Sequence, residues 1–479
     1  MKISRSAKFS GRSSDGDHKA VESEQLSVRT KLAFGIGGFL DNIGQHSINV
    51  LALPVFNVAL GLNPALVGVA MMIFRLWDAF TDPTMGSVSD ATRSRFGRRR
   101  PWMMLGAVLC GVLFPFLWRA SPEWSPTLQA GYFVVIGIFY FTAFTIFSVP
   151  YHALAFEMTP DYHEKTSVMA YRTTINGIAA IAVGWLYAIT QLPVFGGTIS
   201  GVRITSIGIG IVLLICGVIP AWFTKERYFK KVCDEKPVPF LKSIRLTLSS
   251  RPFLILTAMG VAILGGEGAT KSLGLYLNIY YVHGGATAPA SVIQGFMGTV
   301  FAIVSVLSIP LLAVFSKRIG KHQTLCLCLG LGIASSIANW FCITPEHPWL
   351  QMVPVLFVAP GIMGFWLMFS SMTADICDYD ELKNGARREG MFSAVYAWIA
   401  KVSVSMSLGL SGVVIALTGF DQEFGGEQPA GAMLRMRIIY TAVPVACYLL
   451  SFFAVRFYEL NHTVMKEVRT ALEERRGVL

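Results

Sequence analysis

Two aspartates spaced by one helical turn are the residues of this sequence best suited to chemistry. Asp78 and Asp82 lie four residues apart in an apolar run of about residues 64–88. At about 1.5 Å per residue, a helix of that length crosses a bilayer, and the two carboxylates then share one face. A solvated acidic face is not available at this depth, and buried ionisable groups usually line a substrate or ion pathway. The pair therefore predicts a site that binds a cation or shares a proton.

The composition places this pair in a membrane protein. Hydrophobic residues make up 53% of the 479 residues and charged residues 14%, where soluble domains carry about a quarter charged. The net charge of +11 does not indicate a nucleic-acid partner, because the basic residues concentrate in loops between apolar runs. The eight cysteines form no CxxC pair and lie mostly in apolar runs, which favours buried thiols over disulfides or a metal site.

Twelve apolar spans predict twelve transmembrane helices. They run approximately over 31–59, 64–89, 101–120, 127–157, 166–192, 203–223, 252–282, 289–316, 322–343, 350–377, 390–419 and 434–457. A polar link after the sixth span divides them into two halves of six, the layout of the major facilitator fold. The expected fold class is an all-α membrane protein with two six-helix halves. Similar basic turns, Arg95-Phe-Gly97-Arg98 and Arg318-Ile-Gly320-Lys321, follow the second span of each half.

The chain is expected to divide into a disordered N-terminal tail (1–29), a first half (30–224), a linker (225–250), a second half (251–458) and a C-terminal tail (459–479). The N-terminal tail has no apolar core, so it is not a secretory signal. Twenty lysines and arginines occupy the connections on one side, against four on the other. The positive-inside rule makes the basic side cytoplasmic, with both termini on it, and the expected location is a bacterial inner (plasma) membrane.

Other ionisable residues lie at membrane depth. Asp41, Arg172 and Lys401 have no partner nearby on their own helix, so their partners should come from other helices and the three should face a central cavity. Glu267 and Lys271 stand four apart, which fits either a self-neutralising pair or a role in gating or substrate binding. No Walker, HExxH or Ser-His-Asp signature is present, so an enzyme is not expected.

Three groups of residues resemble the glycoside–pentoside–hexuronide cation symporters. The resemblance rests on Arg75-Leu-Trp-Asp78-Ala-Phe-Thr-Asp82-Pro-Thr-Met-Gly86 with its continuation Asp90-Ala-Thr-Arg-Ser-Arg95-Phe-Gly-Arg, on Val149-Pro-Tyr-His-Ala-Leu154 with Glu157, Asp161 and Arg172, and on Ala374-Asp-Ile-Cys-Asp-Tyr379 with Arg388-Glu-Gly390. It covers about residues 31 to 410 and identifies the family without identifying a substrate.

The resemblance implies roles for particular residues. The cation site would comprise Asp78, Asp82, Thr145 and Ser148, and the substrate site Asp41, His152, Arg172, Trp366 and Lys401. A cytoplasmic gating motif would comprise Gly86, Asp90, Arg95 and Gly97. The coupling ion would be H⁺ or Na⁺, with no other cofactor and no metal beyond a Na⁺ ion at Asp78 and Asp82.

Two positions depart from the family pattern. Ser148 and His152 stand where melibiose-permease-type members carry an aspartate and a tryptophan. Losing the acid removes a cation ligand and a bidentate acceptor for sugar hydroxyls together.

The expected function is import of a sugar, glycoside or sugar acid by symport with H⁺ or Na⁺ through alternating access. The proton is somewhat favoured because crowded carboxylates share one readily and it needs fewer ligands than Na⁺. The alternatives are a symporter for a lysolipid or other amphipathic anion and a non-transporting membrane sensor. The expected partners are the substrate, the cation and the lipid bilayer, with a monomer as the working unit.

Overall fold

The computed structural model describes residues 26–159, 162–224, 226, 247, 249–384, 389–460 and 462–476. Most of the predicted N-terminal tail and linker therefore lies outside the described residues. Within them the secondary structure is helical throughout, without a strand.

Twelve long helices make up the bundle in the described part of the chain. The first half contains α2 (Val28–Ala52), α3 (Pro64–Ala91), α4 (Arg100–Phe116), α5 (Pro126–Glu157), α6 (Tyr162–Thr190) and α7 (Thr198–Phe223). The second contains α9 (Arg251–Tyr276), α10 (Thr287–Ile319), α11 (Lys321–Cys342), α12 (Met352–Asn384), α13 (Glu389–Leu417) and α14 (Ala430–Ala454). Ten are long and apolar enough to cross a membrane, and α4 is a shorter apolar helix. Helix α2 is the most polar because it carries Asp41, Asn42, Gln45 and His46. The predicted fold class is confirmed.

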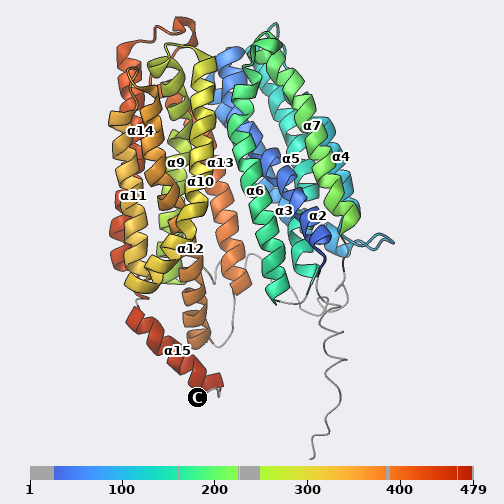
Figure 1. The fold of residues 1–479 in the computed structure, drawn as a ribbon, viewed down its shortest axis with the longest axis vertical. Coiled ribbons are helices and arrows are strands. Elements are labelled where there is room, and N and C mark those ends of the chain that lie inside the picture. The colour runs from blue at the N-terminus through green and yellow to red at the C-terminus, as the bar shows by residue number, and fades with distance from the viewer. Residues whose placement is uncertain are drawn as a thin grey trace, which may run out of the picture.

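The two halves repeat one packing pattern (Figure 1). In the first half α2 packs on α6 and α7, α4 on α5 and α7, and α3 on α5. In the second half the same pairings recur, with α9 on α13 and α14, α11 on α12 and α14, and α10 on α12. The halves meet where α3 packs along α13 and α6 along α10. The internal repeat indicated by the two basic turns is therefore present in the structure.

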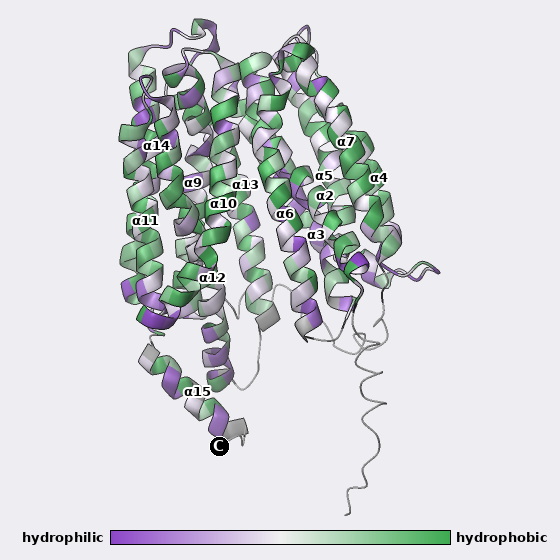
Figure 2. Cartoon of the chain, viewed as in Figure 1, coloured by the Kyte–Doolittle hydropathy of each residue, from purple (hydrophilic) through white to green (hydrophobic). Residues whose placement is uncertain are grey.

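The outside of the bundle is apolar and its ends are polar (Figure 2). Large hydrophobic side chains of α10, among them Val306, Leu307 and Leu311, are exposed on its outer surface. A water-soluble protein would bury such a continuous apolar surface, whereas lipid solvates it.

The two halves approach each other closely at one end of the bundle. We call the end with the turns 92–99 and 319–321 the basic end, and the end with the loops 60–63, 191–197 and 418–429 the opposite end. Toward the opposite end the backbones of α3 and α13 touch, because a Cβ atom added to Gly412 would lie 2.1 Å from the Pro64 carbonyl oxygen. The Tyr276 hydroxyl also donates to Asn57 Oδ1 across the halves at 2.5 Å.

Helices α2 and α9 both finish in π-helical turns at that end, Leu53–Ala59 and Leu277–Val282. Asn57 lies in the first of these turns, and Tyr276 directly precedes the second. π-helical turns are rare and occur frequently at functional sites. Their matched positions therefore indicate that both halves use the same local helix distortion at this end.

The predicted C-terminal tail contains one further helix, α15 (His462–Arg476), beyond the basic end of α12 (Figure 1). Met465, Val468 and Leu472 follow a helical spacing and are buried, while Lys466 and Glu467 are exposed. This one-sided apolar face explains why a highly charged segment forms a helix and packs on α12.

Candidate functional site

The predicted cation site is assembled from three helices. Thr145 on α5 donates to Asp78 Oδ1 at 2.8 Å and to Asp82 Oδ1 at 3.3 Å. From the other half, Lys401 on α13 places its Nζ atom 3.1 Å from Asp78 Oδ2 and in contact with Asp82 Oδ2. Lys401 was expected to find its partners on other helices, and that prediction is confirmed. One ammonium group therefore occupies the space between the two carboxylates and joins the halves.

Aromatic packing fixes the acid pair against α5. Phe74, one turn before Asp78, stacks on Phe141 with ring centroids 5.0 Å apart. Gly137 leaves room for this contact, since a Cβ atom there would lie 2.5 Å from the Phe74 ring. The close approach of α3 and α5 brings Thr145 into hydrogen-bond range of both acids.

A second polar cluster lies entirely within the first half. Arg172 on α6 donates to Asp41 Oδ2 on α2 at 2.9 Å, and His152 Nε2 on α5 lies 3.1 Å from the same oxygen. Helix α2 can approach α6 because Gly35 and Gly38 face it without side chains. The expectation that Asp41 and Arg172 find partners on other helices is confirmed. The His152 side chain is 45% exposed, so this cluster can be reached by a ligand.

The third component of the site is a cavity of about 220 Å³ between the halves. Its polar lining comes from Gln45, Arg75, Asp78, Lys401 and Ser405, and the predicted substrate residue Trp366 forms part of its wall. Ser148 is buried on α5 at a spacing that puts it on one face with Thr145 and His152. This face connects the cation site with the Asp41 cluster.

Glu267 and Lys271 form no direct ion pair, although their charges act on each other. Glu267 Oε1 accepts a hydrogen bond from the Tyr448 hydroxyl at 3.0 Å. Lys271 is exposed, and among the described residues no ion pair within 4.0 Å involves it.

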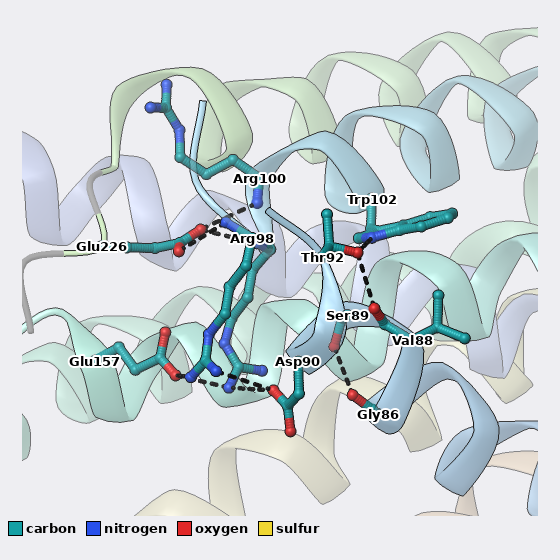
Figure 3. A network of polar contacts seen from close by, with 11 residues as sticks. Gly86, Val88, Ser89, Asp90, Thr92, Arg98, Arg100, Trp102, Glu157 and Glu226 are labelled. Carbon is teal, nitrogen blue, oxygen red and sulfur yellow. Dashed lines mark hydrogen bonds and ion pairs between the residues drawn. The ribbon is translucent and has the colours of Figure 1, made fainter. Parts of the chain in front are cut away.

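The predicted gating motif lies at the basic end beside a network of arginines and acids (Figure 3). Arg99 contacts Asp90 at 3.1 Å and Glu157 at 2.6 Å, and Arg98 contacts the same two acids. The Glu226 carboxylate accepts from the backbone N–H groups of Arg98 at 2.9 Å and Arg99 at 2.8 Å, where α4 begins. A carboxylate is well placed at a helix N-terminus.

Only part of the motif joins this network. Asp90 is a member, and Gly97 adopts φ +102°, a conformation suited to glycine, beside the Glu226 side chain. Gly86 lies beside Val149 of α5. Arg95 instead stacks on Phe96, 4.8 Å from the ring centroid. The sequence-based site omitted Arg98, Arg99, Glu157 and Glu226, although the run of three arginines at 98–100 was a visible signal.

Burial alone would raise the pKa of Glu157, but hydrogen bonds and charge from Arg99 and Arg98 outweigh it, so the pKa lies below its ordinary value. This carboxyl stays ionised and holds both guanidinium groups at neutral pH.

Comparison with known proteins gives a consistent assignment. The sequence model of the MFS/sugar transport protein family matches residues 33–462, most of the chain. The chain belongs to this family. Within it, a putative glycoside/cation symporter of Escherichia coli, YagG, is 24% identical over 95% of this chain and 96% of its own length. The homologues of this chain that are named as symporters support its membership of the glycoside–pentoside–hexuronide type. The chain is therefore a multi-pass secondary transporter.

Two further comparisons bear on this symporter. The sodium-dependent lysophosphatidylcholine symporter 1 of Gallus gallus is 24% identical over 95% of this chain and 90% of its own length. Among solved structures, a bacterial homologue of the human lysosomal transporter Spinster, in an inward-facing and unoccupied conformation, matches with a TM-score of 0.68. At 14% identity over 90% of this chain and 97% of that one, this match shows the fold alone.

Proposed function

We propose that this symporter imports a hydroxyl-rich solute, a sugar, glycoside or sugar acid, together with H⁺ or Na⁺ bound at Asp78 and Asp82. The observation that carries the proposal is the contact of Lys401 with both acids across the two halves. The proposed working unit is a monomer.

Coupling follows from competition for the acid pair. The Lys401 ammonium satisfies both carboxylates, so an arriving cation must displace it. Displacement breaks a contact between α3 and α13 and places a positive side chain in the cavity. Cation binding thereby changes both the adhesion between the halves and the charge presented to the solute, which is the requirement for a coupled cycle.

The proposal includes an inward-facing conformation with the basic end of the bundle in the cytoplasm. The close approaches at the opposite end, with Gly412 against Pro64, support a state open toward the basic end. With the basic end in the cytoplasm, as the charge distribution favours, this state faces inward. A cysteine placed in the turn 93–100 is then labelled from the cytoplasm alone, and one in the loop 420–429 from outside alone. Labelling from the reverse sides contradicts the orientation.

A lysolipid or other amphipathic anion is the second candidate. It is supported by the similarity to the Gallus gallus lysophosphatidylcholine symporter and by Ser148, which offers neither the charge nor the bidentate acceptor of a carboxylate.

The deciding experiment is uptake into proteoliposomes under separate pH and Na⁺ gradients. Radiolabelled sugars, glycosides, sugar acids and lysolipids are offered to wild type and to Ser148→Asp. The proposal predicts that at least one water-soluble sugar class accumulates under one gradient. If the Na⁺ gradient alone drives uptake, the preference for H⁺ is wrong. If lysolipids are transported and no sugar class is, the substrate class is wrong.

A further inference from the structure

Glu267 is an acidic side chain at membrane depth that the proposed function does not use. It lies half-buried on α9, which is long and apolar enough to cross a membrane. Its Oε1 atom accepts a hydrogen bond from the Tyr448 hydroxyl at 3.0 Å. Its Oε2 atom forms no hydrogen bond with any described residue, and no described basic group lies within 4.0 Å of the carboxyl. A carboxylate without a paired cation is costly at this depth, and a bound proton removes that cost.

Close helix packing holds the partner of this carboxyl in place. A Cβ atom added to Gly266 would lie 2.6 Å from Cys447 Sγ, so α9 lies against α14 at this level. A Cβ atom added to Gly332 of α11 would lie 2.5 Å from the Tyr448 ring. Tyr448 is only 1% exposed. Its hydroxyl is therefore held at Glu267 by the packing of three helices.

The tyrosine is a partner for both protonation states of the carboxyl. A phenol hydroxyl can donate a hydrogen bond and can also accept one. It can therefore donate to an ionised Glu267 and accept from a protonated Glu267. A lysine or arginine in its place would stabilise the ionised form alone, because neither has an acceptor. The contact with Tyr448 thus leaves the carboxyl free to change its charge.

Glu267 lies on the face of α9 that borders the cavity between the halves. Leu264, three residues before it, lines this cavity, and Lys271, four residues after it, is exposed. Residues at these spacings share one face of a helix. The charge of Lys271 acts on His46 of α2, so this face is turned toward the first half. A proton can therefore reach the carboxyl from the gap between the halves.

Few charged or titratable groups surround the carboxyl. Helix α14 brings three titratable side chains that interact with it, Tyr440, Cys447 and Tyr448. Helix α13, which also packs on α9, brings the hydroxyl of Ser407 beside Gly268. Among the described residues, Lys271 is the one cation whose charge acts on Glu267.

Lys271 can connect this carboxyl to the solute. Its ammonium group faces the gap and forms no hydrogen bond or ion pair with any described residue. A solute that fills the gap can accept hydrogen bonds from this group and draw its charge away from Glu267. The ionised carboxylate then becomes less favourable, and a proton from water on the open side binds at Oε2. By linkage, the bound proton favours the bound solute to the same extent.

We propose that Glu267 is a second coupling site of this symporter, which binds one proton independently of the acid pair. Tyr448 positions the carboxyl, and Lys271 links its protonation to the solute. The acid pair lies on α3 in the first half, whereas Glu267 lies on α9 in the second, so each ion binds without displacing the other. One transport cycle then moves two cations with each solute. The proton site does not depend on the proposed function, while its link to the solute rests on it.

The first test needs no solute. Infrared difference spectra of the purified protein, recorded from alkaline to mildly acidic pH, report the C=O stretching band of a carboxyl group that takes up a proton. One such band should be present in wild type and in Asp82→Asn but absent in Glu267→Gln. A Glu267 carboxyl that is protonated at every pH, or ionised at every pH, gives no such band and overturns the proposal.

Two further variants test the neighbours of the carboxyl. Lys271→Gln should raise the pH at which the band appears by about one unit, because a nearby positive charge favours the ionised form. The matched control is Lys317→Gln, an exposed lysine near the basic end, which should leave that pH unchanged. Tyr448→Phe should shift the frequency of the band, and it assigns the band to Glu267 if Glu267→Gln does not fold. A band that neither variant alters belongs to another carboxyl and refutes the site.

The second test measures the link to the solute. Calorimetry in buffers of different ionisation enthalpy reports the protons taken up when D-glucose, D-xylose, D-glucuronate or their methyl glycosides bind. Glutamine mimics the protonated carboxyl, so Glu267→Gln should bind the same probe as wild type and take up about one proton fewer. Equal proton uptake by the two proteins, or no binding by the folded variant, refutes the link.

The two tests separate this inference from the proposed function. If no probe binds to wild type, the proposed substrate class fails, and the infrared spectra alone decide the proton site. If a sugar accumulates under a cation gradient and no Glu267 band titrates, the second site is refuted and the proposed function stands.

Discussion

If Lys401 occupies the place of the coupling cation, removing its ammonium should tighten cation binding. In Lys401→Ala the two carboxylates keep Thr145 as a donor but lose their only contacting positive charge among the described residues. A free cation no longer has to displace a tethered competitor. We therefore expect the variant to bind the ion with higher affinity. Transport should be impaired, because ion binding no longer changes a contact between α3 and α13.

The size of the effect can be bracketed from the structure. The Lys401 side chain is 36% exposed, while Asp78 is 2% exposed. Exposed ion pairs contribute about 0.2–1 kcal/mol, whereas breaking a buried pair costs about 3–5 kcal/mol. A half-buried ammonium that can hydrate in the cavity should fall between, at about 2 kcal/mol. Since about 1.4 kcal/mol is tenfold, cation affinity should rise roughly 30-fold.

The assay is thermal unfolding of the purified protein, titrated with NaCl at fixed ionic strength and, separately, with pH. Stabilisation by a bound ion grows as RT ln(1 + [ion]/Kd), so the ion concentration at which the unfolding temperature begins to rise reports the affinity. Lys317→Ala, an exposed lysine near the basic end, is the matched control and should not shift this onset concentration. In a double-mutant cycle, the loss of transport in the double variant Lys401→Ala/Asp82→Asn should be much smaller than the sum of the losses in the two single variants.

Two results would refute this reasoning. An onset concentration in Lys401→Ala that is unchanged or higher than in wild type means that the lysine does not compete with the cation for the acid pair. Simple additivity in the cycle means that Lys401 and Asp82 do not act on each other in the working protein.

Three further predictions concern coupling, closure and the basic end. Asp78→Asn or Asp82→Asn should abolish uphill accumulation while downhill exchange persists, and concentrative uptake at the wild-type level in either variant contradicts the cation site. Gly412→Val should block transport because its side chain has no room beside α3, while Gly330→Ala, with nothing within 4 Å, should leave transport unchanged. Glu157→Gln should lower the unfolding temperature at pH 7. Because the folded pKa of Glu157 lies below its ordinary value, its contribution is complete above about pH 4.3 and is lost as the pH falls through the folded pKa. The gap between wild type and variant should therefore narrow only in acid, and a gap that persists there contradicts the charge-based account.

Much of the fold could be predicted from the sequence because membranes impose simple rules. Backbone groups in lipid must be satisfied by helices, so the length of each apolar run largely determines each span. Buried charges must find partners, which is why Asp41, Arg172 and Lys401 could be expected to contact residues of other helices. The register of Asp78 and Asp82 followed from helical periodicity alone.

Other features depend on packing that no single segment encodes. Arg95 and Arg98 look equivalent in the sequence, yet Arg98 reaches Glu157 while Arg95 stacks on Phe96. The spacing of Glu267 and Lys271 allows a pair, but Tyr448 of α14 binds the acid instead. The helix in the C-terminal tail was not expected, because only three of its apolar residues, Met465, Val468 and Leu472, are buried. The helix is stabilised by packing on α12. In each case a partner distant in the sequence decides the outcome.

The same reasoning explains why the cavity carries more information about the solute than the acid pair does. The acid pair is satisfied as it stands, by Thr145 and Lys401, and so would accept any cation able to displace an ammonium. Arg75 lines the cavity with its Nε atom buried and without a hydrogen-bond partner, so the cavity favours a solute that offers an acceptor. Hydroxyl, carbonyl and carboxylate oxygens all meet that requirement. The cavity therefore restricts the chemistry of the solute, whereas the acid pair restricts only the charge of the ion.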